Sequence, residues 1–574
     1  MNALVHRMLD QGLIDESAAR GISGLLAQGE PPIRAFAVCG AADEPLLRFL
    51  GQELGMPFVE LEPRTFTREF LAKFPARILL DKHIVPLEGE NGEMLAVTSD
   101  PFDTSAIDEL RLATSRDFQI ALAPLAEIDR CIKRYLGVGA DTVQSMISEA
   151  GENGLQVIDT DMDDDMDLTE AAEGASIIRF VNQILTEAIE LRATDVHIEP
   201  FEESLRVRYR IDGVLQEASV AAEVKQFQAA IVSRLKILAK LDIAEKRVPQ
   251  DGRIKIIISG REIDVRVSVI PMIYGEAVVL RLLDRSSVLL GMDKLGMSPR
   301  DLKLMDMVLE RPHGIILVTG PTGSGKTTTL YAALSQINDL ARKIITIEDP
   351  IEYQLHGINQ IQVSRKAGLT FASGLRAILR HDPDVVLIGE IRDSETAEIA
   401  IQASLTGHLV FSTLHTNDAP SALTRLVDMK IEPYLVASSL EAVLAQRLVR
   451  TICKECKEPL SAVEMAPLKK RFGDKLPEVL YKGRGCRQCQ GTGYRGRLGI
   501  FELMVVTDDV RSLIVENASA PELRKVSVKQ GMRSLRDDGF RHLQDGRTTI
   551  EEIMRVTKDE TFGMRDFGDQ DEQK

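Results

Sequence analysis

One short segment limits what this chain can fold into more than any other part of it. The segment reads Gly320-Pro321-Thr322-Gly323-Ser324-Gly325-Lys326-Thr327 and fits the pattern G-x-x-x-x-G-K-[ST]. Its glycines let the backbone curl until the N–H groups point at phosphate oxygens, and Lys326 can reach the β- and γ-phosphates. The Thr327 hydroxyl is a suitable ligand for Mg²⁺. The segment, together with Thr328, therefore predicts a binding site for a nucleoside triphosphate and its magnesium ion.

The flanks of this segment support the prediction. Residues 315–318 form a short apolar run, as expected of a buried parallel strand. After the segment, Leu330, Leu334 and Ile337 recur at helical spacing. A strand, a loop and a helix in this order aim the positive end of the helix at the phosphates.

Length and charge narrow the class of protein. The chain has 574 residues, enough for roughly three to four domains, and a net charge of −17. That charge argues against wholesale nucleic-acid binding. No apolar run approaches the ~18 residues of a membrane span, and no signal peptide opens the sequence. We expect a cytoplasmic protein, or one that partners recruit to a membrane.

Two Cys-x-x-Cys pairs stand near the C-terminal end. They consist of Cys453 with Cys456 and Cys486 with Cys489, separated by 29 residues. In a cytosolic chain, this paired spacing favours a structural zinc site with four thiolates over disulfides or unrelated thiols.

Shifts in composition divide the chain into domains. We expect a small mixed domain over residues 1–138, an acidic linker over 139–175, a second domain over 176–290 and a third over 291–567. The third domain carries a zinc-binding insertion at about 451–492, and a polar tail covers 568–574. The carboxylates of 159–167 could suggest a calcium loop, but the glycine and the terminal glutamate of such a loop are missing.

The second domain shows three strands by strict alternation, at 194–199, 206–211 and 262–267. Each strand has one charged and one apolar face, which predicts a half-buried sheet. Arg206, Arg208 and Arg210 share one face. Either this is a solvated surface or it is suited to phosphate or carboxylate groups, and the residues alone leave both open.

The third domain alternates apolar runs with helical segments, which predicts an α/β fold with a mainly parallel sheet. Its runs at 344–347 and 385–388 are followed by acids, first Glu348 and then Glu390. Such positions at strand ends are where α/β sheets bind ligands. His415 follows the run at 409–411, where it could sense a phosphate.

These segments together resemble the ATPases of type II secretion and type IV pilus assembly. The Walker A, Asp, Walker B and His boxes of that family correspond to 320–327, 345–353, 384–393 and 406–417. Stretches of the second domain match as well, at 193–200, 210–213, 244–253 and 275–276. The resemblance is close over residues 176–562 and looser over 40–138.

The resemblance implies a RecA-like motor domain, a PAS-like α+β second domain and a hexameric ring. It places ATP between the second domain and the motor, with Glu348 and Glu390 handling water and Mg²⁺. His415 would assist, and arginines of the second domain, among them Arg208, Arg210 and Arg266, would close over the phosphates. Expected partners are secretion or pilus platform proteins at the inner membrane, to which the chain would attach peripherally. Secretion and pilus extension share every motif quoted.

Two other classes compete with this interpretation. A zinc-containing nucleic-acid motor would explain the basic residues around the cysteines, but no aromatic series accompanies them. A passive scaffold would bind nucleotide without turnover. Some members of the family bind cyclic di-GMP through paired motifs beginning Arg-Leu-Gly, from which residues 6–14 depart.

Overall fold

A computed structural model describes residues 2–28, 31–38, 43–61, 68–71, 74–75, 78–79, 82–89, 92–136, 168–218, 220–258, 261–284, 291–473 and 476–557. The chain folds into two compact units, Met1–Asp284 and Arg285–Lys574. Most of the expected acidic linker and the whole polar tail lie outside the described residues.

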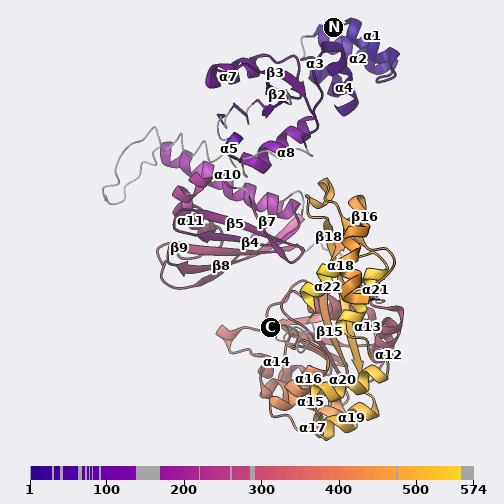
Figure 1. The fold of residues 1–574 in the computed structure, drawn as a ribbon. Coiled ribbons are helices and arrows are strands. Elements are labelled where there is room, and N and C mark those ends of the chain that lie inside the picture. Colours follow the sequence, from indigo (N-terminus) through magenta and orange to yellow (C-terminus); the bar gives the residue numbers. More distant parts are fainter. Residues whose placement is uncertain are drawn as a thin grey trace, which may run out of the picture. The chain divides into compact units, whose positions relative to one another are not determined.

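The second unit, which we call the motor unit, is built on a seven-stranded sheet (Figure 1). In sheet order its strands are β12 (Asn359–Gln362), β11 (Ile344–Glu348), β13 (Val385–Ile388), β14 (Leu409–Leu414), β10 (Gly314–Thr319), β15 (Leu440–Ile452) and β18 (Tyr494–Val505). Neighbouring strands are parallel except β15 and β18, which pair antiparallel. The expected strands and the mainly parallel sheet are thus confirmed.

Helices cover both faces of this sheet. The strands β10, β11, β13 and β14 are therefore buried along their whole length. On one face, α12 and α13 enclose a core that includes Ile316, Val318 and Phe411. The other face packs on α14 to α17, α19 and α20 around Leu317, Ile347 and Val410. Neighbouring residues of one strand belong to opposite cores, as the two-residue period of a strand requires.

The helices of the motor unit are mostly short. They are α12 (Pro299–Leu309), α13 (Lys326–Ile337), α14 (Phe371–Ile378), α15 (Ser394–Leu405), α16 (Pro420–Asp428), α17 (Pro433–Ser439), α18 (Ala462–Phe472), α19 (Asp508–Val515), α20 (Ala520–Lys529), α21 (Leu535–Gln544) and α22 (Ile550–Val556). Several begin with side-chain caps, such as Asp393 before α15 and Ser461 before α18.

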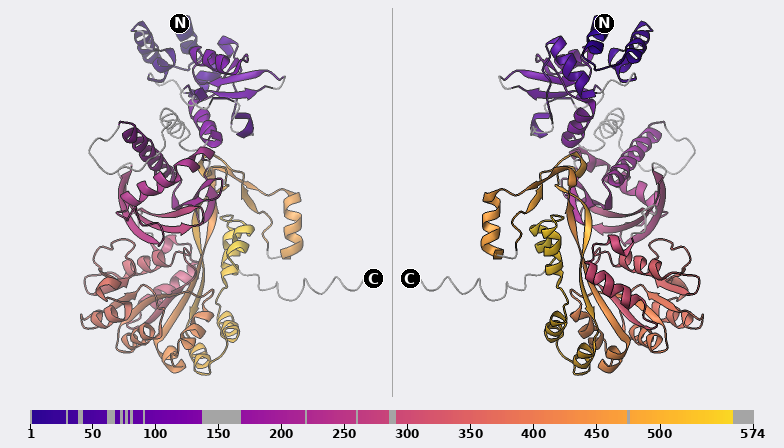
Figure 2. Two further views of the ribbon diagram at one scale, coloured as in Figure 1. Left: turned by 90° about the vertical axis from the view of Figure 1, so that its left-hand side faces the viewer. Right: turned by 90° about the vertical axis from the view of Figure 1, so that its right-hand side faces the viewer.

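An insertion separates β15 from β18 and carries all four paired cysteines. It contains β16 (Lys457–Pro459), α18 and β17 (Tyr481–Gly483). Gly483 and Gly493 meet in it at close range, since a Cβ on Gly483 would lie 2.0 Å from the Gly493 carbonyl oxygen. In Figure 2, α18 is the orange helix that stands apart from the sheet. Its Met465 packs with Leu543 of α21 and Ile550 of α22 in a small separate core.

The second domain of the first unit is a six-stranded antiparallel sheet with two helices on one face. Its strands, in sheet order, are β6 (Val214–Glu217), β5 (Leu205–Ile211), β4 (Ala193–Pro200), β9 (Gly275–Asp284), β8 (Arg261–Met272) and β7 (Gln250–Ile258). The helices α10 (Leu168–Glu190) and α11 (Gln228–Leu238) pack on its apolar face. Burial alternates along β5, so the predicted half-buried sheet is confirmed.

The N-terminal part consists of a helical cluster followed by a small α/β layer. The cluster is α1 (Asn2–Asp10), α2 (Glu16–Ala27), α3 (Pro32–Val38) and α4 (Asp43–Leu54). The layer contains α5 (Arg68–Leu71), β1 (Val85–Glu88), β2 (Met94–Thr98), α7 (Ser105–Thr114), β3 (Gln119–Leu122) and α8 (Leu125–Leu136). Within the described ranges, no helix combines the length and the apolar character needed to cross a bilayer.

Candidate functional site

The loop between β10 and α13 has the backbone of a phosphate cradle. Gly320, Gly323 and Gly325 have φ values of 150°, 77° and 90°, which disfavour residues with a Cβ. A Cβ on Gly320 would lie 2.6 Å from the Gln446 carbonyl oxygen, so the loop also needs glycine for space. The Ser324 hydroxyl is buried and has no hydrogen-bond partner among the residues that the structure describes. An orphaned hydroxyl beside glycine N–H groups fits a phosphate oxygen as its missing partner.

Lys326 begins α13 and curls back over the loop. Its Nζ donates to the carbonyl oxygens of Gly320 at 2.8 Å and Pro321 at 3.1 Å. Burial lowers the pKa of Lys326, which Glu390 opposes and Arg447 reinforces. Loop carbonyls are weak partners for an ammonium group compared with phosphate oxygens, so the lysine can exchange them for a nucleotide.

Glu390 follows β13 and faces the same site. Its Oε1 lies 2.6 Å from Nη2 of Arg392, and its Oε2 lies 3.4 Å from Nε2 of His415. The Glu390 side chain is 13% exposed and that of His415 is 51% exposed. The structure therefore brings Lys326, Glu390 and His415 together at the carboxyl ends of β10, β13 and β14.

Glu348 ends β11 but is held more firmly inside the fold. Its Oε2 accepts from the Tyr331 hydroxyl at 2.5 Å, and its Oε1 accepts from Thr346 at 2.6 Å and from Gln360 at 3.2 Å. Burial and the charge of Glu348 raise the pKa of Tyr331, so this phenol stays a donor. Since Tyr331 belongs to α13, a hydrogen bond connects Glu348 to the helix that follows the phosphate loop.

Four arginines and one aspartate of the second domain form a single row across five strands. Register places Arg210 beside Asp195, Asp195 beside Arg281, Arg281 beside Arg266, and Arg266 beside Arg253. Asp195 accepts from Nε of Arg281 at 3.1 Å and lies 3.6 Å from Nε of Arg210. The row itself thus holds four guanidinium groups and one carboxylate. Arg208 lies outside this row and pairs with Glu199 at 2.7 Å.

The four paired cysteines converge on one point in the insertion. Their sulfur atoms all lie within 4.8 Å of one another. Sγ of Cys453 is 3.7 Å from that of Cys486, and Sγ of Cys456 is 3.8 Å from that of Cys489. A zinc ion with Zn–S bonds of ~2.3 Å sets sulfurs about 3.8 Å apart in a tetrahedron, so the donor set fits this metal.

Backbone donors prepare one of these sulfurs for a metal. Burial opposes ionisation of Cys489, but N–H groups of Cys486 and Gly493, at 3.1 Å and 3.3 Å, prevail and lower its pKa to about 7. A thiolate is the form that binds metal.

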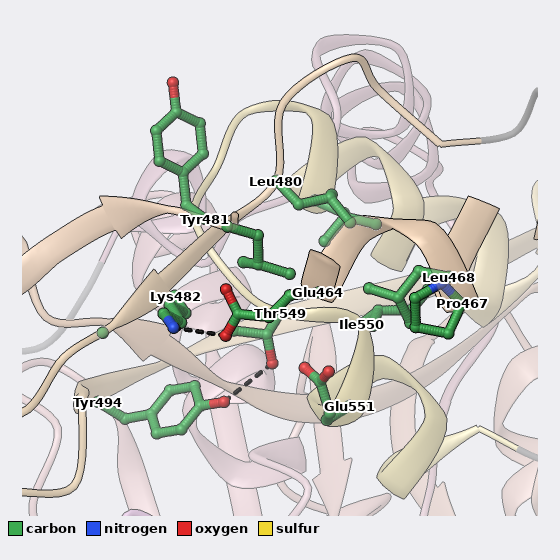
Figure 3. Close-up of a pocket in the computed structure, with 13 residues that line it drawn as sticks. Glu464, Pro467, Leu468, Leu480, Tyr481, Lys482, Tyr494, Thr549, Ile550 and Glu551 are labelled. Atoms are coloured by element: carbon green, nitrogen blue, oxygen red, sulfur yellow. Dashed lines mark hydrogen bonds and ion pairs between the residues drawn. The ribbon is translucent and has the colours of Figure 1, made fainter. Parts of the chain in front are cut away.

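A pocket of about 470 Å³ lies beside the insertion, away from the phosphate loop. Figure 3 shows it between α18, β17 and the start of α22, with Leu468, Leu480 and Ile550 among its lining. Two polar contacts border it, from Lys482 to Glu464 and between Tyr494 and Thr549. None of the predicted site residues lines it.

The sequence located the loop, the acids and the cysteines, but it missed several residues around them. These are Tyr331 and Gln360 on Glu348, Arg392 on Glu390, Arg447 behind the loop, and Arg281 in the arginine row. Register along β8 and β9 would have indicated Arg281, since it stands opposite Arg266. The other contacts come from the tertiary fold.

A three-layer α/β unit with a glycine-rich loop before α13, and with acids at the ends of neighbouring parallel strands, defines a P-loop ATPase. Comparison with known proteins gives its family. The chain belongs to the Type II/IV secretion system protein family, whose model matches residues 170–555, and a MshEN domain model matches residues 54–141.

Two relatives illustrate the membership. Type II secretion system protein E of Pseudomonas aeruginosa is 51% identical over 461 residues, covering 77% of this chain and 91% of its own length. The type IV pilus assembly ATPase PilB of Myxococcus xanthus is 43% identical over 533 residues, covering 92% of this chain and 94% of its own. Among solved structures, the pilus retraction motor PilT with bound ADP is 29% identical, covers 66% of this chain and 96% of its own, and has a TM-score of 0.44.

Proposed function

We propose that this ATP hydrolase powers the assembly of a pseudopilus for type II protein secretion. The observation that carries the proposal is the convergence of Lys326, Glu390 and His415 on a loop whose Ser324 hydroxyl lacks a partner within the described part of the chain. The relatives named for type II secretion support the choice of process.

Each residue of the site has a role that its surroundings favour. Residues 320–328 bind the triphosphate, with Lys326 on the β- and γ-phosphates and Thr327 as a ligand of Mg²⁺. Glu390 organises the metal and the attacking water, because it follows β13 and its charge acts on Lys326. His415 orients Glu390 or senses the γ-phosphate. Glu348 assists from the neighbouring strand.

The second domain completes the site in this proposal. Arg210 and Arg266 close over the phosphates, and Arg281 joins them because it stands between Asp195 and Arg266 in the row. Several guanidinium groups along one row suit the charge that spreads over a transferring phosphoryl group. Arg208 stabilises the sheet through Glu199 instead. The active form is a hexamer attached to platform proteins at the cytoplasmic side of the inner membrane.

The insertion binds one zinc ion through Cys453, Cys456, Cys486 and Cys489. Four protein ligands close the coordination shell, so the ion holds the insertion together and takes no part in hydrolysis. The fit of the sulfur separations to a tetrahedron supports zinc.

Type IV pilus extension is the second candidate, favoured by the 92% of this chain that the relative PilB covers. Deletion of the gene separates the two processes. Loss of secreted enzymes from the medium with normal surface pili supports secretion, whereas loss of pili with normal secretion supports extension.

A further inference from the structure

Two neighbouring residues of β15 form the wall behind the phosphate loop. Gln446 is 2% exposed, and its Oε1 accepts from the Thr329 hydroxyl of α13 at 2.7 Å. A Cβ on Gly325 would lie 2.8 Å from Nε2 of Gln446. Arg447 is 8% exposed and lies at the start of the loop, where a Cβ on Gly320 would come within 3.0 Å of its Nη1.

The guanidinium of Arg447 contacts the residue before it on β15 and a segment 30 residues earlier in the chain. Its Nη1 donates to the Gln446 carbonyl oxygen at 2.9 Å. Its Nη2 donates to the carbonyl oxygen of Asn417 at 2.9 Å and to the side-chain oxygen of Asn417 at 3.3 Å. Arg447 thus connects the wall of the phosphate loop to the segment that follows β14.

That segment carries His415, two residues before Asn417. Two backbone N–H groups also hold it, from Thr416 to the Thr319 hydroxyl at 2.9 Å and from Ala419 to the Glu502 carboxylate at 2.8 Å. Arg447 adds hydrogen bonds from a charged guanidinium, which donates to Asn417 in this segment and to the Gln446 carbonyl oxygen on β15. A shift of Asn417 would move the His415 ring relative to Glu390, from which it is separated by 3.4 Å.

We propose that Arg447 is a positioning residue that fixes the His415–Glu390 pair relative to the phosphate loop and thereby sets the rate of hydrolysis. The inference rests on the roles proposed above for His415 and Glu390. This role requires an arginine. The planar guanidinium can donate to Gln446 and to Asn417 at the same time, whereas a lysine offers a single ammonium group.

Three variants test the inference in the full-length protein, by ATP turnover and by binding of a fluorescent ATP analogue. R447Q should lower kcat at least ~10-fold with nucleotide affinity within about threefold, the pattern of a group that acts in the transition state. R447K should recover little of the lost kcat. In an H415A background, R447Q should have almost no further effect, since the two changes act through one unit.

R450Q is the matched control. Arg450 lies on the same strand, pairs with Glu552 at 2.7 Å, and has no contact with the phosphate loop among the described residues. Its loss should lower thermal stability and leave kcat per folded protein unchanged.

Several results would overturn the inference. They are full turnover in R447Q, rescue by R447K to the wild-type kcat, additive losses in R447Q with H415A, or full turnover in H415A itself. If R447Q does not fold, R447K decides alone, since wild-type kcat in it contradicts the two-armed role. Full turnover in E390Q would instead refute the proposed site, whatever Arg447 does.

Discussion

Nε2 of His415 lies 3.4 Å from Oε2 of Glu390, at the carboxyl ends of the neighbouring parallel strands β14 and β13. The imidazole is half exposed while the carboxylate is largely covered. The imidazole therefore reaches Glu390 from the solvent side. The two side chains come from segments that the sequence indicated separately, and the sheet order makes them neighbours.

Removal of the loop lysine should abolish turnover without unfolding the protein. K326A loses the charge that would bind the phosphates, so we expect ATP hydrolysis to fall at least ~100-fold. Its thermal unfolding should match the wild type, because Lys326 bonds only to loop carbonyls within the described structure. K303A, on the exposed surface of α12, is the control and should keep full activity. Turnover retained in K326A would refute the site.

The Tyr331–Glu348 hydrogen bond should stabilise the motor unit. Y331F leaves a buried carboxylate with one donor fewer, which costs about 1–3 kcal/mol. We expect a lower unfolding temperature by differential scanning fluorimetry and slower hydrolysis, because Glu348 loses its link to α13. Y353F is the comparison, since Tyr353 packs edge-on against Tyr331 at 4.6 Å and has no hydrogen bond to Glu348 in the described structure. An unfolding temperature equal to that of the wild type in Y331F would contradict this role.

Metal analysis should find about one zinc per protomer in protein purified without chelators, because four thiolates form one closed site. C486S should lose the ion and unfold the insertion locally, while the phosphate loop keeps its nucleotide affinity. C131S removes a buried thiol outside the cluster and should retain the zinc. Zinc content near zero in the wild type would refute the site.

His542 should make stability depend on pH. Burial, with Arg541 and Arg547, lowers its pKa to about 3, and its Nε2 accepts from Nη2 of Arg541 at 2.8 Å. Below the ordinary value of about 6.5, the unfolded chain takes up a proton that the folded chain refuses, so stability falls as pH decreases from about 6.5 toward 3. H542Q should weaken the fall in unfolding temperature between pH 7 and 5. H313Q changes an exposed histidine and should leave the slope unchanged. An equal slope in H542Q would contradict the assignment.

Sequence patterns predicted the parts of the site that depend on local order. The glycines of 320–325 and the cysteine pairs have fixed spacing, and Glu390 comes two residues after an apolar run. Alternation of charged and apolar residues also predicted strands where β4, β5 and β8 lie. Patterns could not show that Arg447 of β15 reaches Asn417 or that Tyr331 binds Glu348, because those contacts depend on sheet order and helix packing. Strand register likewise decides that Arg208 pairs with Glu199 and lies outside the row that contains Arg210 and Arg266.

Nucleotide binding and turnover, measured together in E390Q, show whether Glu390 organises the metal and the attacking water. The amide keeps the shape of the side chain but offers no full charge to a metal ion and takes no proton. We predict that E390Q binds ATP with an affinity within about threefold of the wild type and hydrolyses it at least ~100-fold more slowly. E395Q, at an exposed position in the first turn of α15, should retain wild-type turnover. Hydrolysis by E390Q at the wild-type rate would contradict the account.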